Sequence, residues 1–204
     1  MRVLVTGGTG FVGSQVVRKL LDDSHHVRIF SRGVVNADIF GGRSVEVVSG
    51  DLANASSLID ALEGMEVLFH IGEIKNTTKA ASEKNLKLLE GVLGQTNRKK
   101  LRRIVFVSSI TVSGIPSAVP ADGDTVPKHI MNDHYTGYKR RAEKLLIEHA
   151  GAVEYSIIRP APVYGAGSRY LGRFIRIIDR FGHLGVPFPG DAENLAPLIH
   201  VEDL

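Results

Sequence analysis

Tyr135 and Lys139 are the residues whose types and spacing point most directly to chemistry. They stand four positions apart in a helical pattern, so both side chains emerge on one face of a helix, which Tyr138 does not share. A phenol with a pKa near 10 is a poor acid or base at neutral pH, but a nearby ammonium favours the phenolate. The pair indicates proton transfer at a hydroxyl or carbonyl oxygen. Taken alone, the spacing also fits an amphipathic helix with a half-buried tyrosine and a solvated lysine.

A glycine-rich loop follows the first apolar run of the chain and precedes a helical pattern. Its sequence is TGGTGFVG over residues 6–13. Gly7 and Gly8 permit a tight turn, Gly10 lets the backbone approach a pyrophosphate, and Gly13 lets the following helix pack on the strand. The helix N-terminus then offers unpaired N–H groups to an anion. The loop is typical of a dinucleotide site, although a plain strand-to-helix turn can share the pattern.

The composition is that of an ordinary globular protein. Of the 204 residues, 43% are hydrophobic and 23% charged, which excludes disordered and fibrous classes. The chain contains no cysteine, which excludes disulfides, thiolate metal sites and a cysteine nucleophile, and the cytoplasm is the expected compartment. No secretory leader or bilayer-length apolar stretch is recognisable, so we expect neither export nor a membrane partner.

The charge is only mildly basic. A formal net charge of +3 suits small anionic ligands at least as well as nucleic acid. No two of the eight histidines have the i,i+4 spacing of metal ligands, so we expect no metal site. Arginines at positions 169, 173, 176 and 180 recur at helical spacing. They predict a basic stripe that meets an anionic partner or simply forms a solvated helix face.

Strand-like and helix-like segments alternate along the chain, which predicts a doubly wound α/β fold with a parallel sheet of about seven strands. Right-handed crossovers place the carboxyl ends of the strands at one edge, where ligands bind. Residues 113–133, with three prolines, are expected to form a loop at the substrate mouth. The expected strands are Arg2–Val5, His26–Phe30, Ser44–Val48, Val67–His70, Ile104–Val107, Tyr155–Ile158 and Leu198–His200. The expected helices are Ser14–Leu21, Ser56–Leu62, Ser82–Leu93, Tyr135–His149 and Tyr170–Phe181.

Six motifs occur along the chain in a fixed order. They are TGGTGFVG at Thr6–Gly13, GDL at Gly50–Leu52, FH at Phe69–His70, VSSITVSG at Val107–Gly114, YTGYK at Tyr135–Lys139 and RPAPVYG at Arg159–Gly165. Together they resemble an extended short-chain dehydrogenase/reductase of the NAD-dependent epimerase/dehydratase type, over essentially the whole chain. The resemblance implies a Rossmann fold. It also implies that Ser109, Tyr135 and Lys139 are catalytic, with Ser109 bonded to the reacting oxygen and Lys139 holding the nicotinamide ribose.

The resemblance also implies the residues of the cofactor site. Asp51 would accept from the adenine amino group, and Leu52 would pack on the ring. Arg32 follows the second expected strand, where NAD-dependent members tend to carry a carboxylate. Because a cation there suits a 2′-phosphate, we expect NADP in preference to NAD, with an exposed strand-end arginine as the alternative. The glycine loop would bind the cofactor through Gly7, Gly10, Phe11, Val12 and Gly13.

Three departures from the family pattern restrict the activity. Gly72-Glu73 stands where a small-residue pair is usual, and Ser113 where many members have tyrosine. Ile110-Thr111 occupies the place of the Asp-Glu pair with which dehydratases eliminate water. A dehydratase is therefore less favoured than an epimerase or a simple reductase. The expected substrate is a nucleotide sugar or a free carbonyl or alcohol compound.

Two parts are expected along the chain. Residues 1–165 would form the NAD(P)-binding Rossmann domain, and residues 166–204 the start of a substrate-binding region. The final HVEDL resembles a family segment that normally leads into a further helix, so we expect a truncated chain. A small molecule is the expected partner, and the resemblance allows a homodimer through the Tyr135 helix. A non-catalytic nucleotide sensor or RNA-binding relative of the same fold is the alternative, although the trio containing Ser109 favours an enzyme.

Overall fold

The computed structural model describes residues 1–74, 78–96, 101–116, 127–149, 153–182 and 197–204. The chain divides into two compact units, Met1–Arg159 and Pro160–Leu204, and each is considered by itself. This division falls a few residues before the boundary expected after residue 165. The functional roles expected for the two parts stay predictions.

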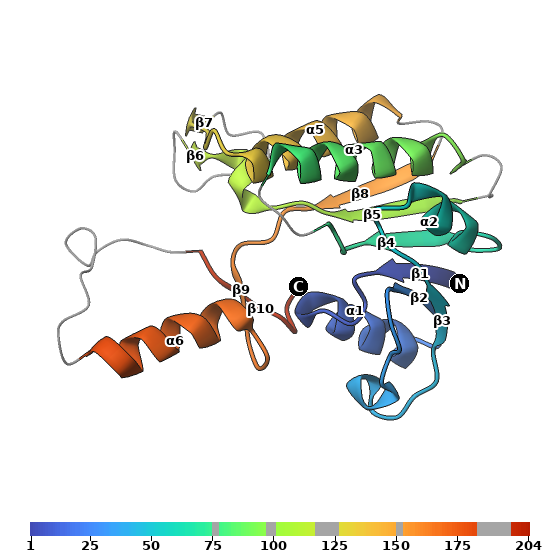
Figure 1. Cartoon of the computed structure of the whole chain (residues 1–204), viewed down its shortest axis with the longest axis horizontal. Coiled ribbons are helices and arrows are strands. Elements are labelled where there is room, and N and C mark those ends of the chain that lie inside the picture. The colour runs from blue at the N-terminus through green and yellow to red at the C-terminus, as the bar shows by residue number, and fades with distance from the viewer. Residues whose placement is uncertain (75–77, 97–100, 117–126, 150–152, 183–196) are drawn as a thin grey trace. The chain divides into compact units, whose positions relative to one another are not determined.

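A parallel sheet of six strands forms the first unit (Figure 1). The order across the sheet is β3-β2-β1-β4-β5-β8, so successive strands leave β1 in one direction as far as β3 and then continue on its other side from β4. This reversal beside β1 is the Rossmann arrangement, and the doubly wound fold is confirmed. The strands are β1 (Arg2–Thr6), β2 (His26–Ser31), β3 (Glu46–Ser49), β4 (Val67–His70), β5 (Arg103–Val107) and β8 (Glu154–Ile158).

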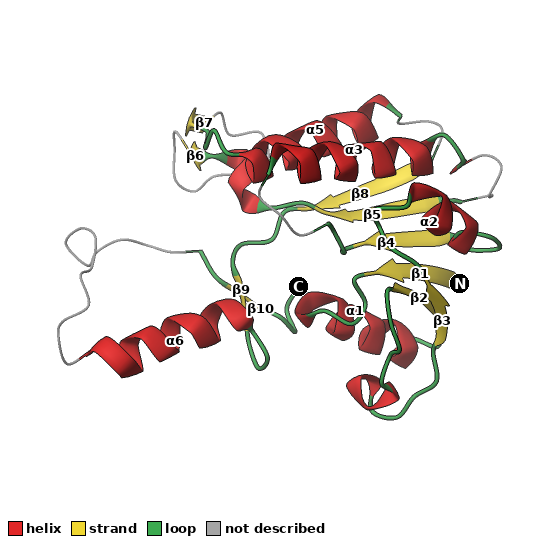
Figure 2. Cartoon of the chain, viewed as in Figure 1, coloured by secondary structure: helices red, strands yellow, loops and turns green. Residues whose placement is uncertain are grey.

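Helices cover both faces of the sheet (Figure 2). Side chains alternate along β1, so Val3 and Val5 pack with α1 on one face while Leu4 packs with α2 and α3 on the other. A 3-10 turn, η1 (Ala37–Phe40), adds Phe40 to the α1 face. The helices of this unit are α1 (Phe11–Asp22), α2 (Ala55–Ala61), α3 (Lys79–Leu93) and α5 (His134–Glu148).

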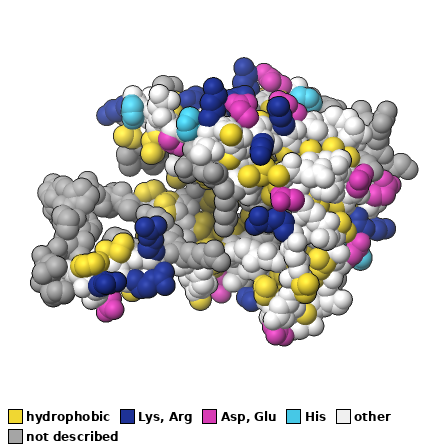
Figure 3. All heavy atoms as spheres, viewed as in Figure 1, with side chains coloured by type: hydrophobic (Ala, Val, Ile, Leu, Met, Phe, Trp, Pro, Cys, Tyr) yellow, Lys and Arg dark blue, Asp and Glu magenta, His cyan; other side chains and the backbone are white. Residues whose placement is uncertain are grey.

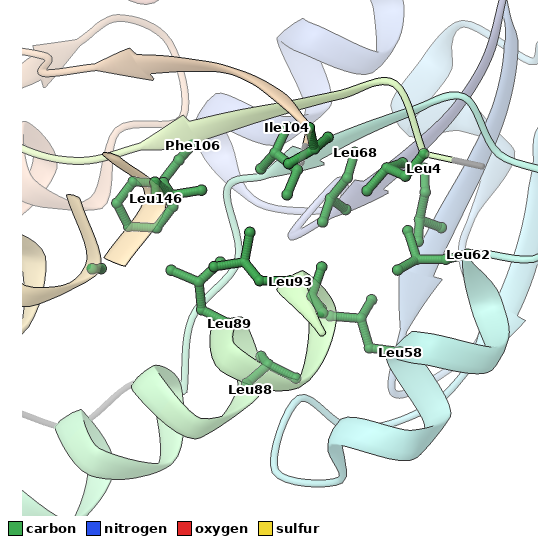
Figure 4. Packing of buried hydrophobic residues seen from close by; sticks show 14 of the residues in the cluster. Leu4, Leu58, Leu62, Leu68, Leu88, Leu89, Leu93, Ile104, Phe106 and Leu146 are labelled. Atoms are coloured by element: carbon green, nitrogen blue, oxygen red, sulfur yellow. The ribbon is translucent and has the colours of Figure 1, made fainter. Parts of the chain in front are cut away.

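The larger hydrophobic core lies between the sheet and helices α2, α3 and α5 (Figure 4). Leucines of α2 and α3 meet Leu68 of β4 and Ile104 of β5 there. Helix α5 buries Tyr138, Ala142 and Leu146, which recur every four residues and form its apolar stripe. Because this stripe must face the core, it fixes the rotation of α5 and thereby the direction in which the catalytic candidates on that helix point.

The seventh expected strand, Leu198–His200, does not join the sheet. Instead β10 (Ile199–His200) pairs in parallel with β9 (Val163–Tyr164) inside the second unit, so the sheet has six strands rather than about seven. β9 was not expected, because two residues are too few to show an alternating pattern. The second unit also contains α6 (Arg169–Phe181).

The expected loop over residues 113–133 contains regular structure at its ends. A 3-10 turn, η2 (Ile110–Ser113), leads into β6 (Ile115–Pro116), which pairs antiparallel with β7 (Pro127–His129). Its middle, residues 117–126, lies outside the described residues, and so does the prediction of a substrate mouth there. On α6, Arg173, Arg176 and Arg180 are exposed, while the side chain of Arg169 is outside the description. None of the described helices combines the length and the hydropathy needed to cross a bilayer.

Neighbouring residues of α5 give a matched test of this packing. The Leu146 side chain is 1% exposed and Ile147 is 51% exposed. Leu146→Ala should lower the free energy of unfolding by about 2–5 kcal/mol, because it leaves a cavity in the core. Ile147→Ala should change it by no more than about 0.5 kcal/mol. Urea unfolding followed by circular dichroism measures both, and similar small losses would contradict the described orientation of α5.

Candidate nucleotide and catalytic site

Glycines make direct backbone contact in the loop between β1 and α1. Gly7 has φ +71°, in the left-handed region, and a Cβ there would lie 2.7 Å from the Cα of Gly72. A Cβ on Gly13 would lie 2.1 Å from the Gly7 carbonyl oxygen. Neither position admits a side chain without moving backbone, because real Cβ atoms do not approach that closely. The loop is therefore held against the segment after β4, at the reversal of strand order.

The N-terminus of α1 has the features of an anion site. Its N-cap is Gly10, which has no side chain to cap the helix, and its first turn carries no acidic residue. The N–H groups of Phe11, Val12 and Gly13 have no partner within a helix, and the helix dipole places positive charge there. A side-chain-free loop that ends at an uncapped helix fits the pyrophosphate of a dinucleotide. The residues present therefore fit the cofactor that the sequence predicts.

The end of β4 is tied to the end of β1 beside this loop. The Nδ1 atom of His70 lies 2.9 Å from the hydroxyl of Thr6, and this hydroxyl accepts from the N–H of Gly72 at 3.1 Å. Burial, reinforced by the charge of Lys139, lowers the pKa of His70 to about 3. The imidazole is thus neutral at physiological pH. It acts here as a polar link between two central strands.

Tyr135 lies in the first turn of α5, which begins at a side-chain cap. The carboxylate of Asp133 accepts from the N–H of Thr136 at 2.9 Å and from its hydroxyl at 2.8 Å. Such a cap satisfies N–H groups that have no partner at the start of a helix, and it fixes where the helix begins. The position of Tyr135 at the sheet edge follows from this cap together with the buried stripe of α5.

Ser109 stands at the carboxyl end of β5 and does two things. Its hydroxyl oxygen accepts from the N–H of Thr111 at 3.3 Å and from the Thr111 hydroxyl at 3.1 Å, so it caps η2. It also lies close enough to Tyr135 to lower the pKa of that phenol, against the larger effect of burial. The strand-end cap that the sequence allowed is thus present, while the bond from Ser109 to a reacting oxygen beside Tyr135 stays a prediction.

Lys139 is a buried ammonium held by two oxygen atoms. Its residue is 4% exposed, and Nζ donates to the carbonyl of Val107 at 2.7 Å and pairs with Oε2 of Glu73 at 3.1 Å. Nζ lies 5.7 Å from the ring centroid of Tyr135 and 4.9 Å from that of Phe106. Burial lowers the pKa of Lys139, and the Glu73 carboxylate opposes that change. The alternative of a solvated lysine is therefore wrong, whereas the half-buried phenol is present.

The proton on Tyr135 is held more tightly than the sequence suggests. Burial raises the pKa of Tyr135 above its ordinary value of 10.0, and the Glu73 carboxylate raises it further, while Ser109 acts in the opposite direction. The expectation of a lowered Tyr135 pKa is wrong in this structure, because the net change is upward. The main reason is the burial of the phenol, and the carboxylate of Glu73, which pairs with the ammonium, adds to it.

Glu73 is the site residue that sequence reasoning missed. The sequence shows it only as a departure from a small-residue pair, yet it follows β4, which pairs directly with β5. Carboxyl ends of adjacent parallel strands converge, and that rule could have placed Glu73 near Ser109. Its pairing with a lysine on a distant helix leaves no local signal in the sequence.

The residues expected to bind adenosine follow β2 and β3, which pair directly. One carboxylate oxygen of Asp51 accepts from the N–H of Ala53 at 2.9 Å, and Leu52 is half-buried against the larger core. Arg32 is exposed. These residues share the carboxyl edge of the sheet with the glycine loop. Among the described residues, no three or more His, Cys, Asp or Glu side chains gather as metal ligands would.

Two curated relatives show how far the sequence similarity extends. Over 185 residues the chain is 31% identical to 3β-hydroxysteroid dehydrogenase/Δ5→4-isomerase of Mycobacterium tuberculosis, covering 84% of this chain and 50% of that protein. It is 29% identical over 214 residues to UDP-glucose 4-epimerase of Vibrio cholerae, covering 99% of this chain and 63% of that protein. The chain thus spans about half the length of the first relative and under two thirds of the second.

A solved structure and a family model agree with this similarity. The structure of MoeE5 in complex with UDP-glucuronic acid and NAD matches with a TM-score of 0.77 and 26% identity, over 98% of this chain and 68% of that one. The model of the NAD dependent epimerase/dehydratase family matches residues 3–204. The fold, the glycine loop and the order of motifs fit the same family. The chain therefore belongs to the NAD-dependent epimerase/dehydratase family of extended short-chain dehydrogenases/reductases.

Proposed function

We propose that the chain is the cofactor-binding and catalytic part of an NAD(P)-dependent epimerase or oxidoreductase that acts at a hydroxyl or carbonyl carbon. The observation that carries this proposal is the meeting of Ser109, Tyr135 and Lys139 at the sheet edge that also holds the glycine loop. The nicotinamide, when bound, supplies the hydride chemistry. The protein supplies binding, orientation and the proton.

Each of the three side chains has a separate role in the proposed reaction. Tyr135, a neutral phenol at physiological pH, donates its proton to a carbonyl oxygen and recovers one when the reaction runs toward oxidation. Ser109 orients the reacting oxygen beside the phenol. Lys139 would hold the nicotinamide ribose, because an ammonium has three N–H donors and the carbonyl of Val107 takes one of them.

The proposed cofactor is NADP in preference to NAD, and Arg32 supports it. The side chain is exposed at the end of β2, beside the strand that leads to Asp51. A guanidinium can bind a 2′-phosphate with two hydrogen bonds. The ribose of NAD carries no 2′-phosphate, so NAD would not make these bonds. The compartment that we propose for this reaction is the cytoplasm.

Two substrate classes fit the proposal. One is a nucleotide sugar, for which oxidation is transient and the net reaction is epimerisation. The other is a free carbonyl or alcohol compound, for which oxidation or reduction is the net result. The family relatives include a hydroxysteroid dehydrogenase and a UDP-glucose epimerase. Net change in nicotinamide absorbance separates the classes, because an epimerase shows none at steady state.

The non-catalytic or RNA-binding alternative has less support on the surface shown in Figure 3. Over α3 and α5, acidic side chains lie beside basic ones rather than leaving a uniformly positive patch. The pairs include Arg141 with Glu83 and Lys144 with Glu148.

A homodimer through α5 is part of the proposal. A small-molecule substrate is the partner that the site chemistry favours.

Tyr135→Phe tests the acid/base role. In the full-length protein that contains this chain, it should lower kcat by about 10²–10⁴-fold, because proton transfer loses its positioned group. Tyr155→Phe, on β8 and partly buried against the core, is the matched control and should leave kcat near the wild-type value. The assay follows nicotinamide absorbance and sugar stereochemistry over a panel of UDP-sugars and hydroxysteroids. Full activity of Tyr135→Phe would remove the proposed mechanism.

Gly13→Ala tests the cofactor loop. The added Cβ would meet the Gly7 carbonyl oxygen at 2.1 Å, so the loop must move away from the helix N-terminus. Dinucleotide affinity should fall roughly tenfold or more, since the backbone donors to phosphate are displaced. Gly91→Ala on α3 adds a Cβ at an ordinary 3.5 Å contact and should bind as the wild type does. Calorimetric titration with NAD and NADP measures this, and equal affinities for both variants would contradict the loop assignment.

Arg32→Asp tests cofactor choice. Loss of a hydrogen bond to a charged phosphate should weaken NADP binding by about 10–100-fold, and the new carboxylate should favour the ribose hydroxyls of NAD. Arg140→Asp, a charge reversal at another exposed arginine, on α5, is the control. The ratio of the two dissociation constants is the measurement. An unchanged NADP/NAD ratio would exclude Arg32 as the discriminating residue.

A further inference from the structure

Glu73 enters the catalytic cluster from a strand that carries none of the three catalytic candidates. It lies three residues beyond the end of β4, and its side chain is 27% exposed, so it is neither deeply buried nor freely solvated. Oε2 contacts the ammonium of Lys139 at 3.1 Å, and the Lys139 side chain is only 5% exposed. The pair joins the segment after β4 to helix α5, with the ammonium 5.7 Å from the ring centroid of Tyr135.

Glu73 is the carboxylate that compensates the charge of Lys139. The second oxygen on the ammonium, from Val107, is an uncharged carbonyl. Glu143 also acts on Lys139 at longer range, but both of its carboxylate oxygens bind Arg159, at 3.0 and 2.7 Å. A buried ammonium without a counter-charge is strongly disfavoured. Within the described part of the chain, loss of Glu73 would therefore leave Lys139 without a paired carboxylate.

The charged and titratable groups around Tyr135 come from three directions. Asp133, Tyr138 and Lys139 belong to α5 and its cap, and the carboxylate of Asp133, which accepts from Thr136, also raises the pKa of Tyr135. Ser109, at the start of η2, lowers the pKa of the phenol, and Glu73, in the segment after β4, raises it. His70, at the end of β4, is neutral. Lys139 and Glu73 thus form the ion pair beside the phenol, and the carboxylate of Glu73 raises the pKa of Tyr135.

The charge balance shows what Glu73 does. With Glu73 present, the pair is neutral, and ionising the phenol gives the cluster one net negative charge. Without it, the cluster starts with one positive charge, and ionising the phenol makes it neutral. In a partly buried site the second change is more favourable than the first. A carboxylate at this place therefore favours the protonated phenol.

We propose that Glu73 is a positioning residue of this site: its pairing with Lys139 fixes the ammonium against β5, and its charge keeps Tyr135 acting from the protonated form. The inference rests on the proposed function. It predicts which reaction is favoured at a given pH. At neutral pH a protonated phenol donates to a carbonyl oxygen, so reduction is favoured. Removal of a proton from an alcohol then requires alkaline conditions.

Tyrosinate absorbance during alkaline titration tests the proposal on the full-length protein, without cofactor or substrate. Subtracting the titration of a matched Tyr135→Phe variant isolates this phenol from the other four tyrosines of the chain. Glu73→Gln should lower the pKa of Tyr135 by about one unit or more, because the carboxylate is removed and the ammonium remains. Glu73→Asp keeps the charge and should restore most of the difference. Glu154→Gln, paired with Arg103 at the opposite edge of the sheet, should change nothing.

A second background keeps the test decisive if Glu73→Gln does not fold. Lys139→Met should raise the pKa of Tyr135, and adding Glu73→Gln to Lys139→Met should lower it again by about one unit, with no unpaired charge left inside. A Tyr135 titration that is unchanged or raised by Glu73→Gln in the background that folds would overturn the proposal.

Activity measurements separate this inference from the proposed function. In alcohol oxidation, the rising limb of kcat/KM with pH should move to lower pH in Glu73→Gln by the same amount as the titration. If Tyr135→Phe abolishes hydride transfer but Glu73→Gln leaves the titration unchanged, the proposed function holds and the role of Glu73 fails. If the titration shifts but the wild-type protein transfers no hydride, the proposed function fails instead.

Discussion

The buried ammonium of Lys139 is the interaction on which the candidate site depends. It ties together three pieces of chain that are far apart in sequence: helix α5, the carbonyl of Val107 on β5, and Glu73 beyond β4. A charge at this depth is tolerated only when its hydrogen bonds are satisfied. The position of one side chain therefore constrains two strand ends and a helix together. That arrangement also positions the phenol of Tyr135.

Hydrophobic packing determines where the ammonium can lie. Tyr138, Ala142 and Leu146 turn one face of α5 toward the sheet, and this rotation brings Lys139 to the strand edge while leaving Tyr135 half-buried. Two glycines act in a comparable way at the nucleotide loop, where the absence of side chains lets the backbone of Gly7 rest against Gly72. Helix α5 packs through large buried side chains, whereas the nucleotide loop packs closely because its glycines have none.

The sequence predicts the parts of the molecule that depend on local pattern. The six strands of the sheet were expected within about two residues of their ends, because apolar runs bounded by turn residues mark them. The meeting of Ser109 with Tyr135 was expected from the family resemblance, while the catalytic and cofactor roles of these residues stay predictions. β9 and β10 were not resolved from the sequence as a pair, because two residues carry no period. The sign of the Tyr135 pKa change was missed because burial, its largest cause, and the carboxylate of Glu73, which follows β4, both come from tertiary packing.

His70 has a consequence for how this fold responds to acid. Its imidazole is held neutral in the folded chain, with a pKa of about 3, whereas an unfolded histidine titrates near 6.5. At a pH between those two values, His70 binds a proton in the unfolded chain but not in the folded chain. Acidification below neutrality therefore draws the equilibrium toward unfolding, and the link between β1 and β4 becomes a built-in source of acid lability. β1 and β4, the central strands beside the glycine loop, thus hold the group that lowers the stability of the fold as the pH falls.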